Sequence, residues 1–370
     1  MKLRLTAPCR FGLEKTLSFE IKRAGGENLE ISDGRINFDG DETVLVRCNL
    51  TLSVAERVGI VLGEFTATTF DELFEQVKAL PVEQFVGKFD RFPVKGHSLN
   101  SVLKSEPACQ KIIKKALVER LKSVYGIGYF QETEALYQFV FSIMKNKVTV
   151  TLDTTGDGLH KRGYRKLSNA APIRETLAAG IVDLARVRDN DVICDPFCGS
   201  GTLLIESALK ALNIAPGLNR TFSAEEWECI PKQLWQDERE RARAAIKTDC
   251  GFTAYGFDID EEAVQLTLHN AKEAGVADRI HVEKRDIKDF TYPENVTCVL
   301  TNPPYGERLL EQEQARELYK ALGKALLPLD GRRAYVITPD AEFETMFGQK
   351  AGKNRKLYNG MLMCRLYSYY

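Results

Sequence analysis

An apolar run that ends in an acidic, glycine-containing turn is the feature that most constrains the fold of this chain. Residues 191–195 are followed by Pro-Phe-Cys-Gly-Ser-Gly-Thr at 196–202 and then by the helix-forming stretch 203–209. In a strand–turn–helix unit of this kind, Gly199 and Gly201 would let the backbone approach a ligand closely, and the first helical amides would face it. The sequence therefore predicts a nucleotide-type cofactor site in an α/β fold.

Two familiar nucleotide-binding signatures do not fit this turn. The dinucleotide fingerprint Gly-x-Gly-x-x-Gly requires a third glycine, but Leu204 stands at that position. A phosphate-binding P-loop requires Gly-Lys-Ser/Thr, and Gly201 is followed directly by Thr202. A nicotinamide oxidoreductase and a P-loop nucleotide hydrolase are therefore both disfavoured.

A second motif, Thr-Asn-Pro-Pro-Tyr-Gly at 301–306, follows the apolar run 298–300. Prolines stiffen the backbone and remove its donors, which leaves the carbonyl oxygens as acceptors. The side chain of Asn302 adds another acceptor, and Tyr305 offers a flat aromatic face. These parts suit an amino group on a planar base, although a proline-rich structural turn after a core strand is the alternative interpretation.

Both motifs resemble those of S-adenosylmethionine (SAM)-dependent methyltransferases. Residues 195–202 look like motif I of that class, and residues 302–305 look like the signature of enzymes that methylate exocyclic nitrogens of adenine or guanine. The resemblance implies that Asp195 holds the ammonium group of the cofactor. The cofactor-binding residues expected in this turn are Asp195, Pro196, Phe197, Cys198, Gly199, Ser200, Gly201 and Thr202. The expected catalytic residues are Asn302, Pro303, Pro304 and Tyr305, with Tyr305 stacked on the target base.

Acids at the ends of two further strands complete the expected cofactor site. Asp258 ends the apolar run 253–257, where acids bind ribose hydroxyls in doubly wound folds. Ile259 follows it in the expected site, and Asp260 is the weaker candidate for the ribose. Asp286 follows the run 280–284 and is expected either to take the adenine amino group or to be an ordinary loop acid. Asp195 and Asp258 lie 63 positions apart, against about 20 in a minimal unit, so an insertion is predicted at about 213–250.

Composition places the chain among reduced globular proteins of more than one domain. Its 370 residues exceed one typical core. No run approaches the ~20 apolar residues that cross a bilayer, and the first residues lack the apolar segment of a signal peptide. The nine cysteines include no Cys-x-x-Cys pair, so neither a disulfide framework nor a metal site is expected. We expect a cytoplasmic protein.

The net charge of −1 conceals a strongly uneven distribution. Residues 25–86 carry 12 acids and 4 bases, whereas residues 87–125 carry 9 bases and 3 acids. Clustered positive charge attracts phosphates, and the stretch 107–124 has helical apolar spacing with lysines on its other faces. A solvated helix face is the alternative. The RNA-binding residues expected from this pattern and from the linker are Lys95, Lys111, Lys114, Lys115 and Arg162. For Arg162, a salt-bridged linker is the alternative interpretation.

The N-terminal half resembles a THUMP domain, which is an RNA-binding module, preceded by a ferredoxin-like domain. The resemblance rests on residues 92–98, on the helix 110–121 and on two strands at 137–143 and 147–153, with Asn146 at the turn between them. The expected fold is therefore α/β, with a Rossmann-like class I methyltransferase domain preceded by α+β ferredoxin-like and THUMP domains. Strands at 333–338 and 356–370 are expected to close a mixed sheet with an antiparallel hairpin. Pro172 is expected to start the helix that precedes motif I. The expected domain bounds are 1–60 for the ferredoxin-like domain, 61–155 for THUMP and 156–370 for the methyltransferase.

The whole chain is similar to the THUMP-containing bacterial family of 23S ribosomal RNA guanine-N2 methyltransferases. This resemblance implies transfer of a methyl group from SAM to an exocyclic amino group of RNA, with S-adenosylhomocysteine (SAH) as product and no metal. Three alternatives remain open at this point. The enzyme could act on guanine N2 of tRNA or on adenine N6, or the chain could be a non-catalytic RNA-binding assembly factor.

Overall fold

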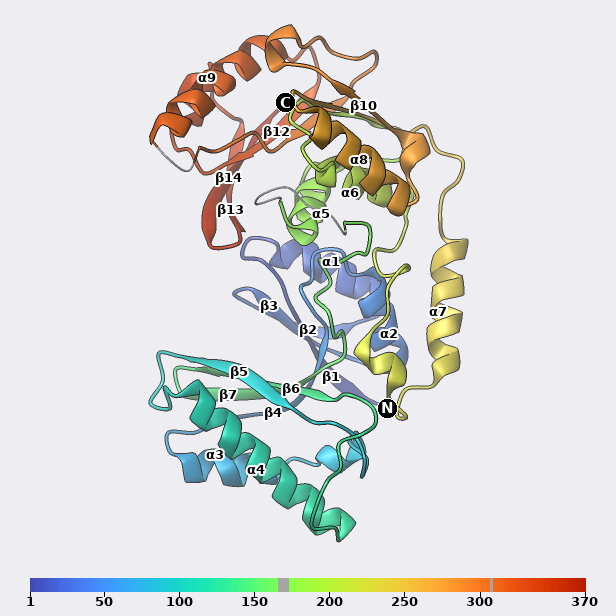
Figure 1. Ribbon diagram of the computed structural model, residues 1–370, viewed down its shortest axis with the longest axis vertical. Helices are drawn as coiled ribbons and strands as arrows, with labels where there is room; N and C mark the ends of the chain where they lie inside the picture. The colour runs from blue at the N-terminus through green and yellow to red at the C-terminus, as the bar shows by residue number, and fades with distance from the viewer. Residues whose placement is uncertain (166–172, 307–308) are drawn as a thin grey trace. The chain divides into compact units, whose positions relative to one another are not determined.

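The computed structural model describes residues 1–165, 173–306 and 309–370 (Figure 1). These residues form two compact units. The first unit contains Met1–Pro8, Ser18–Leu159 and Thr221–Arg241, and the second contains Cys9–Leu17, His160–Arg220 and Ala242–Tyr370. The position predicted for Pro172 at a helix start lies outside the described residues.

One seven-stranded sheet runs through the first unit in the order β2-β3-β1-β4-β7-β6-β5. Its strands are β1 (Leu3–Pro8), β2 (Glu27–Ser32), β3 (Arg35–Gly40), β4 (Gly59–Thr66), β5 (Val94–Leu99), β6 (Gln138–Met144) and β7 (Lys147–Asp153). The central strand β4 pairs antiparallel with β1 on one side and with β7 on the other. The two domains predicted for residues 1–155 therefore share a continuous sheet, and residue 60, the predicted boundary, lies within β4.

Helices and turns of the first unit follow local sequence signals. The helices with residues in this unit are α1 (Glu14–Ala24), α2 (Glu42–Thr51), α3 (Phe70–Lys78), α4 (Glu106–Tyr125) and α7 (Lys232–Ala244). The basic helix predicted at 107–124 is α4, which begins after the N-cap Ser105 and ends at Gly126 with φ +66°. α3 and α4 lie side by side (Figure 1). Lys145 and Asn146, both with positive φ, form the predicted turn between β6 and β7.

Most of the region predicted as an insertion packs within the first unit. The ring of Trp227 stacks on Tyr137 with 4.4 Å between centroids, and its indole N–H donates to the Leu136 carbonyl at 2.9 Å. Glu238 of α7 accepts two hydrogen bonds from Arg47, at 2.7 and 3.0 Å. Buried aromatic surface and a two-pronged ion pair therefore anchor residues 221–241 to the N-terminal elements.

The second unit contains a mixed seven-stranded sheet in the order β10-β9-β8-β11-β12-β14-β13. Its strands are β8 (Val192–Asp195), β9 (Thr253–Asp258), β10 (Ile280–Lys284), β11 (Cys298–Thr301), β12 (Arg333–Thr338), β13 (Lys353–Asn359) and β14 (Leu362–Tyr369). The first five in this spatial order are parallel, and β14 pairs antiparallel with both β12 and β13. The predicted mixed sheet with an antiparallel closing hairpin is confirmed.

Helices pack against this sheet, which explains why its central strand β11 (Cys298–Thr301) is buried without alternation. The helices are α5 (Glu175–Leu184), α6 (Thr202–Ala211), α8 (Glu261–Glu273), α9 (Leu309–Leu326) and α10 (Phe343–Phe347). In β11, Cys298, Val299 and Leu300 are all fully buried, as expected of a parallel strand covered on both faces. The chain continues from β8 to β9 and β10 on one side and returns to β11 on the other. This reversal of strand order is where open α/β sheets bind ligands.

Candidate active site

A cavity of about 590 Å³ lies at the carboxyl ends of β8, β9, β10 and β11. The parallel strands bring residues far apart in the sequence to this one edge of the sheet. The cavity is lined by all of the predicted catalytic and cofactor-binding residues except Gly201, namely Asp195, Pro196, Phe197, Cys198, Gly199, Ser200, Thr202, Asp258, Ile259, Asp286, Asn302, Pro303, Pro304 and Tyr305.

The end of β9 fixes one side of the glycine-containing turn. The backbone N–H of Cys198 donates to the carbonyl of Phe257 at 2.9 Å. The backbone N–H of Gly199 donates to Oδ2 of Asp258 at 2.9 Å, and that of Asp260 donates to Oδ1 at 3.0 Å. Both carboxylate oxygens of Asp258 are thereby oriented, and each keeps acceptor capacity for a hydroxyl in the cavity.

Helix α8 holds the other side of the turn through two polar side chains that were not predicted from the sequence. Thr267 donates its hydroxyl to the carbonyl of Gly199 at 2.8 Å, and Asn270 donates its amide to the carbonyl of Ser200 at 2.9 Å. Both side chains are fully buried. Their only sequence signal is a pair of polar residues three positions apart on the apolar face of an amphipathic helix.

The two glycines of the turn have different surroundings, and cofactor contact by Gly201 stays a prediction. Both have positive φ, +54° at Gly199 and +74° at Gly201. A Cβ at Gly199 would meet no atom within 4 Å, and Gly199 lines the cavity. A Cβ at Gly201 would lie 2.5 Å from Cγ2 of Thr267. Gly201 is therefore required by the packing of the turn on α8, and it is absent from the cavity wall.

Asp195 supplies a buried carboxylate to the cavity. Its side chain is 1% exposed, and Oδ1 accepts a hydrogen bond from the backbone N–H of Phe197 at 3.1 Å. Burial raises the pKa of Asp195 to about 7, against the opposing effect of the Phe197 N–H, and the charge of Asp258 raises it further. Asp195 forms no ion pair with any residue that the structure describes. The cavity therefore contains an acceptor suited to a cationic group.

At the end of β11, the side chains of Asn302 and Tyr305 contact each other. The hydroxyl of Tyr305 donates to Oδ1 of Asn302, the oxygen expected to receive the target amine. Burial raises the pKa of Tyr305, so its hydroxyl stays protonated and remains a donor. The stacking expected of the Tyr305 ring stays a prediction.

Tyr319 of α9, another residue not predicted from the sequence, contacts the carbonyl of only one of the two prolines, Pro304. Its hydroxyl donates to the carbonyl of Pro304 at 3.0 Å and lies 3.1 Å from Oγ1 of Thr338. The Pro304 carbonyl is therefore engaged within the protein. Among residues 1–165, 173–306 and 309–370, no donor contacts the carbonyl of Pro303.

Several other cavity residues lacked a sequence signal strong enough to single them out. Arg285 and Lys288 flank the predicted Asp286, which accepts a hydrogen bond from the Lys288 N–H at 3.0 Å. The Arg285 guanidinium lies over the Phe257 ring, 4.7 Å from its centroid. The remaining lining residues are Ile173, Leu203, Ile287, Gly306, Glu311 and Leu318. Within the described part of the chain, no group of three or more His, Cys, Asp or Glu could hold a metal ion.

The four lysines predicted to bind RNA differ in their exposure and in their contacts with acidic residues. Lys111 and Lys115 are exposed on α4, next to a shallow hollow of about 680 Å³. Lys114 is half-buried, with its Nζ 3.4 Å from the centroid of the Phe92 ring and 2.6 Å from Glu132. Lys95 lies 3.8 Å from the buried carboxylate of Asp153. RNA contact by these four lysines stays a prediction.

The prediction that Arg162 contacts RNA is wrong. Its side chain is 2% exposed and its Nε lies 3.4 Å from Oε1 of Glu206, which also accepts the hydroxyl of Tyr164 at 3.0 Å. Neighbouring Arg165 donates to Oγ1 of Thr202 at 3.3 Å. The cationic linker therefore belongs to a buried network beneath the start of α6, where a phosphate cannot reach Arg162.

Three family models match successive parts of the chain. A model described as "RlmL ferredoxin-like domain" matches residues 4–59, and one described as "THUMP domain" matches residues 67–153. A third, described as "RMKL-like, methyltransferase domain", matches residues 162–368. The described residues include no helix that is both long and apolar enough to span a membrane.

Two curated relatives and two solved structures align over nearly the whole chain. "Putative RNA methyltransferase YpsC" of Bacillus subtilis is 42% identical, with 100% of this chain and 96% of the relative covered. "Ribosomal RNA large subunit methyltransferase K/L" of Psychromonas ingrahamii is 33% identical, with 98% of this chain covered. The chain spans about half the length of that relative (49%).

Both solved structures superpose closely on this chain. A "possible methylase" from Clostridium difficile 630 has a TM-score of 0.96 at 44% identity, covering 100% of this chain and 98% of the other. "SMU.472, a putative methyltransferase complexed with SAH" has a TM-score of 0.95 at 37% identity, with the same coverage of both chains.

Proposed function

Because the chain belongs to the RMKL-like methyltransferase family and combines ferredoxin-like, THUMP and catalytic domains, we propose that this SAM-dependent RNA methyltransferase modifies N2 of guanine in 23S ribosomal RNA. The observation that carries the proposal is the meeting of Asn302 and Pro303 with Asp195 and Asp258 in one cavity. The name of the K/L relative supports large-subunit ribosomal RNA as the substrate.

The residues present fit SAM, which when bound supplies an electrophilic methyl group on a sulfonium centre. We assign Asp195 to the ammonium group, because this buried carboxylate has no ion-pair partner in the described part of the chain and a cation would stabilise it. Asp258, held by two backbone amides, would accept ribose hydroxyls, and Asp286 would accept the adenine amino group. Gly199 leaves open space at the cavity wall for the ligand.

The acceptors at the end of β11 would orient the target amine. Guanine N2 is a poor nucleophile because its lone pair is conjugated with the ring. Oδ1 of Asn302 has two acceptor positions. It can therefore accept one hydrogen bond from the Tyr305 hydroxyl, which orients the Asn302 side chain, and another from the target amine. The Pro303 carbonyl would take the second amine hydrogen. Positioning and electrostatic complementarity would then supply most of the rate.

The cysteines of the site do not support a covalent mechanism. Burial raises the pKa of Cys298 to about 12, and the residue lies within β11. Cys198 lines the cavity, but burial raises its pKa well above the ordinary value. Since the thiolate is the nucleophilic form, both thiols are unreactive at neutral pH. Direct transfer to an amino group is the chemistry that the site supports.

The test is the identity of the product. The purified full chain is incubated with methyl-labelled SAM and protein-free ribosomal RNA from a strain that lacks the gene, and the RNA is digested to nucleosides. We expect label in N2-methylguanosine from 23S RNA. Label in N6-methyladenosine, or label confined to a parallel tRNA sample, would contradict the proposal.

A further inference from the structure

A second hollow of about 810 Å³ lies at the opposite edge of the sheet of the second unit. Its lining includes Asp191, just before β8, Thr297, just before β11, and Arg333, the first residue of β12. Parallel strands begin at one edge of a sheet and end at the other. This hollow, which we call the basic groove, is therefore separate from the cofactor cavity, which lies where the same strands end.

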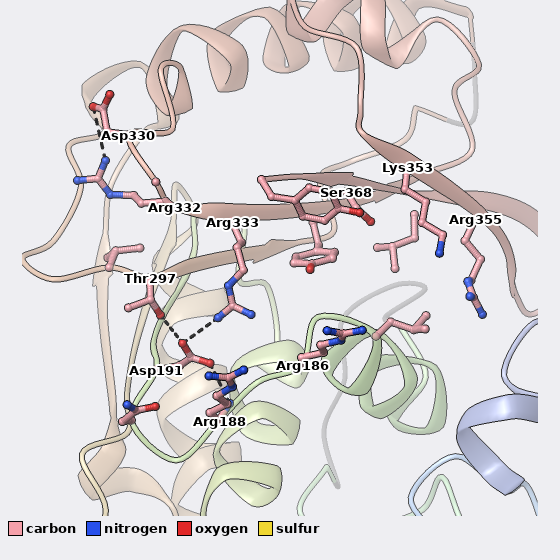
Figure 2. Close-up of a pocket in the computed structure, with 17 residues that line it drawn as sticks. Arg186, Arg188, Asp191, Thr297, Asp330, Arg332, Arg333, Lys353, Arg355 and Ser368 are labelled. Atoms are coloured by element: carbon pink, nitrogen blue, oxygen red, sulfur yellow. Dashed lines mark hydrogen bonds and ion pairs between the residues drawn. The ribbon is translucent and has the colours of Figure 1, made fainter. Parts of the chain in front are cut away.

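Cationic side chains dominate the lining of the basic groove. Its six cations are Arg186, Arg188, Arg332, Arg333, Lys353 and Arg355, and its two carboxylates are Asp191 and Asp330. The side chains of the lining thus carry a net charge of +4, whereas the side chains of the whole chain sum to −1. Figure 2 shows Lys353 and Arg355 extending from the sheet on one side, and Arg186 and Arg188 from the segment after α5 on the other.

Internal contacts hold three of the cations in the wall. Arg333 donates to the Ala185 carbonyl at 2.7 Å and to Oδ1 of Asp191 at 2.8 Å. Arg332 lies over the Tyr292 ring, 4.2 Å from its centroid, and Arg355 donates to the Gly12 carbonyl at 2.9 Å. The same Asp191 carboxylate accepts the hydroxyl of Thr297 at 2.7 Å (Figure 2). These contacts hold the three cations in the wall, and they occupy the Asp191 carboxylate.

The other three cations are available to a ligand. Arg186, Arg188 and Lys353 are exposed, and none forms an ion pair within residues 1–165, 173–306 and 309–370. Arg186 has φ +56°, a left-handed conformation that glycine usually adopts where a helix ends. Bringing three unneutralised cations to one groove costs electrostatic free energy that a polyanion would relieve.

We propose that the basic groove binds the phosphate–ribose backbone of the RNA substrate, as a contact separate from the THUMP domain and from the cofactor cavity. The free cations lie on facing walls and do not converge on one point, which suits successive phosphates of a chain. Guanidinium groups match phosphate geometry with paired donors. The proposal rests on RNA being the substrate and does not depend on which base is methylated.

The test compares two triple charge reversals in the full chain. The groove variant is Arg186→Glu, Arg188→Glu, Lys353→Glu. The matched control is Arg243→Glu, Lys272→Glu, Lys324→Glu, which changes the charge equally at exposed positions of the second unit outside the groove. Affinity for 23S RNA transcribed in vitro is measured from 50 to 200 mM salt, with SAH calorimetry and thermal unfolding alongside.

Each lost phosphate contact reduces the slope of log affinity against log salt by about 0.7 to 0.9. We expect the groove variant to bind RNA on the order of tenfold more weakly than the control at the lowest salt, with a slope reduced by about two to three. Its SAH affinity and melting temperature should match those of the control. An RNA affinity and salt slope equal to the control's would overturn the proposal.

Two further outcomes separate this proposal from others. Competition for the groove by micromolar inorganic pyrophosphate would assign it to a small anion and overturn the RNA assignment. A product other than N2-methylguanosine would contradict the proposed function while leaving the binding result intact. If the groove variant binds RNA as the control does and still forms N2-methylguanosine, the groove proposal is contradicted and the proposed function is not.

Discussion

Among the residues of the site, Asp195 has the carboxylate whose burial costs folding free energy when it is ionised. It is fully buried and its pKa is raised to about 7 by burial. Between its ordinary pKa near 4 and this value, the folded, ligand-free protein keeps a proton that the unfolded chain has released. Stability of the ligand-free fold therefore decreases as pH rises through this window. A bound ammonium group reverses the effect, because it favours the ionised carboxylate.

Cofactor binding should consequently release a proton from Asp195 at acidic pH. At pH 6 we expect calorimetry of SAH binding in buffers of different ionisation enthalpy to show close to one proton released, falling toward none above pH 7.5. Asp195→Asn should abolish this release and weaken SAH binding. Proton release that persists unchanged in Asp195→Asn would show that another group binds the ammonium.

At the scale of elements, the cofactor turn depends on the helix that follows the neighbouring strand. α8 provides hydrogen bonds from Thr267 and Asn270 to the turn, and Thr267 also leaves no room for a side chain at Gly201. The unit formed by β8, the turn and α6 therefore depends on contacts from the next unit, which is formed by β9 and α8. Gly256 in β9 leaves room for α6, the helix that follows the turn, since a Cβ there would lie 2.6 Å from Cδ1 of Leu204.

Matched alanine substitutions should separate packing from ligand access. Gly199→Ala and Gly201→Ala share the cost of a left-handed residue, about 1–2 kcal/mol. Only Gly201→Ala adds overpacking against Thr267, which costs about 1–3 kcal/mol more. Urea denaturation followed by circular dichroism should show this difference, and Gly199→Ala should weaken SAH binding with less loss of stability. Equal losses of stability would contradict the assignment of Gly201 to packing.

At the scale of the molecule, the sequence predicted the parts of the site in which a chemical motif directly follows an apolar strand-like run. Asp195, Asp258 and Asn302 could be placed in one site because each follows an apolar run, and parallel strands end at one edge. The prediction for Arg162 was wrong because the sequence of a charged linker does not show whether an arginine side chain in it is buried or exposed. Thr267 and Tyr319 were not predicted because their roles depend on tertiary packing. Gly201 was predicted, but its packing against Thr267 was not, because Thr267 lies 66 positions away in the sequence.

The basic groove was also beyond the reach of the sequence. Its cations come from the segment after α5, from the start of β12 and from β13, which are far apart in the sequence. Only the sheet register brings them to one edge. Charge clustering along the chain identified α4, whereas clustering in space identified a second candidate RNA contact.

Orientation of the target amine by Asn302, beside the methyl donor, is the step on which the proposed function depends. It can be tested by single-turnover methyl transfer to ribosomal RNA in Asn302→Ala, with Tyr305→Phe for comparison and SAH calorimetry on both. One well-placed polar contact can supply ~3 kcal/mol to a transition state, so Asn302→Ala should be slower by roughly a hundredfold or more with unchanged SAH affinity. Tyr305→Phe keeps the ring and should lose less. Full transfer activity in Asn302→Ala would contradict this role.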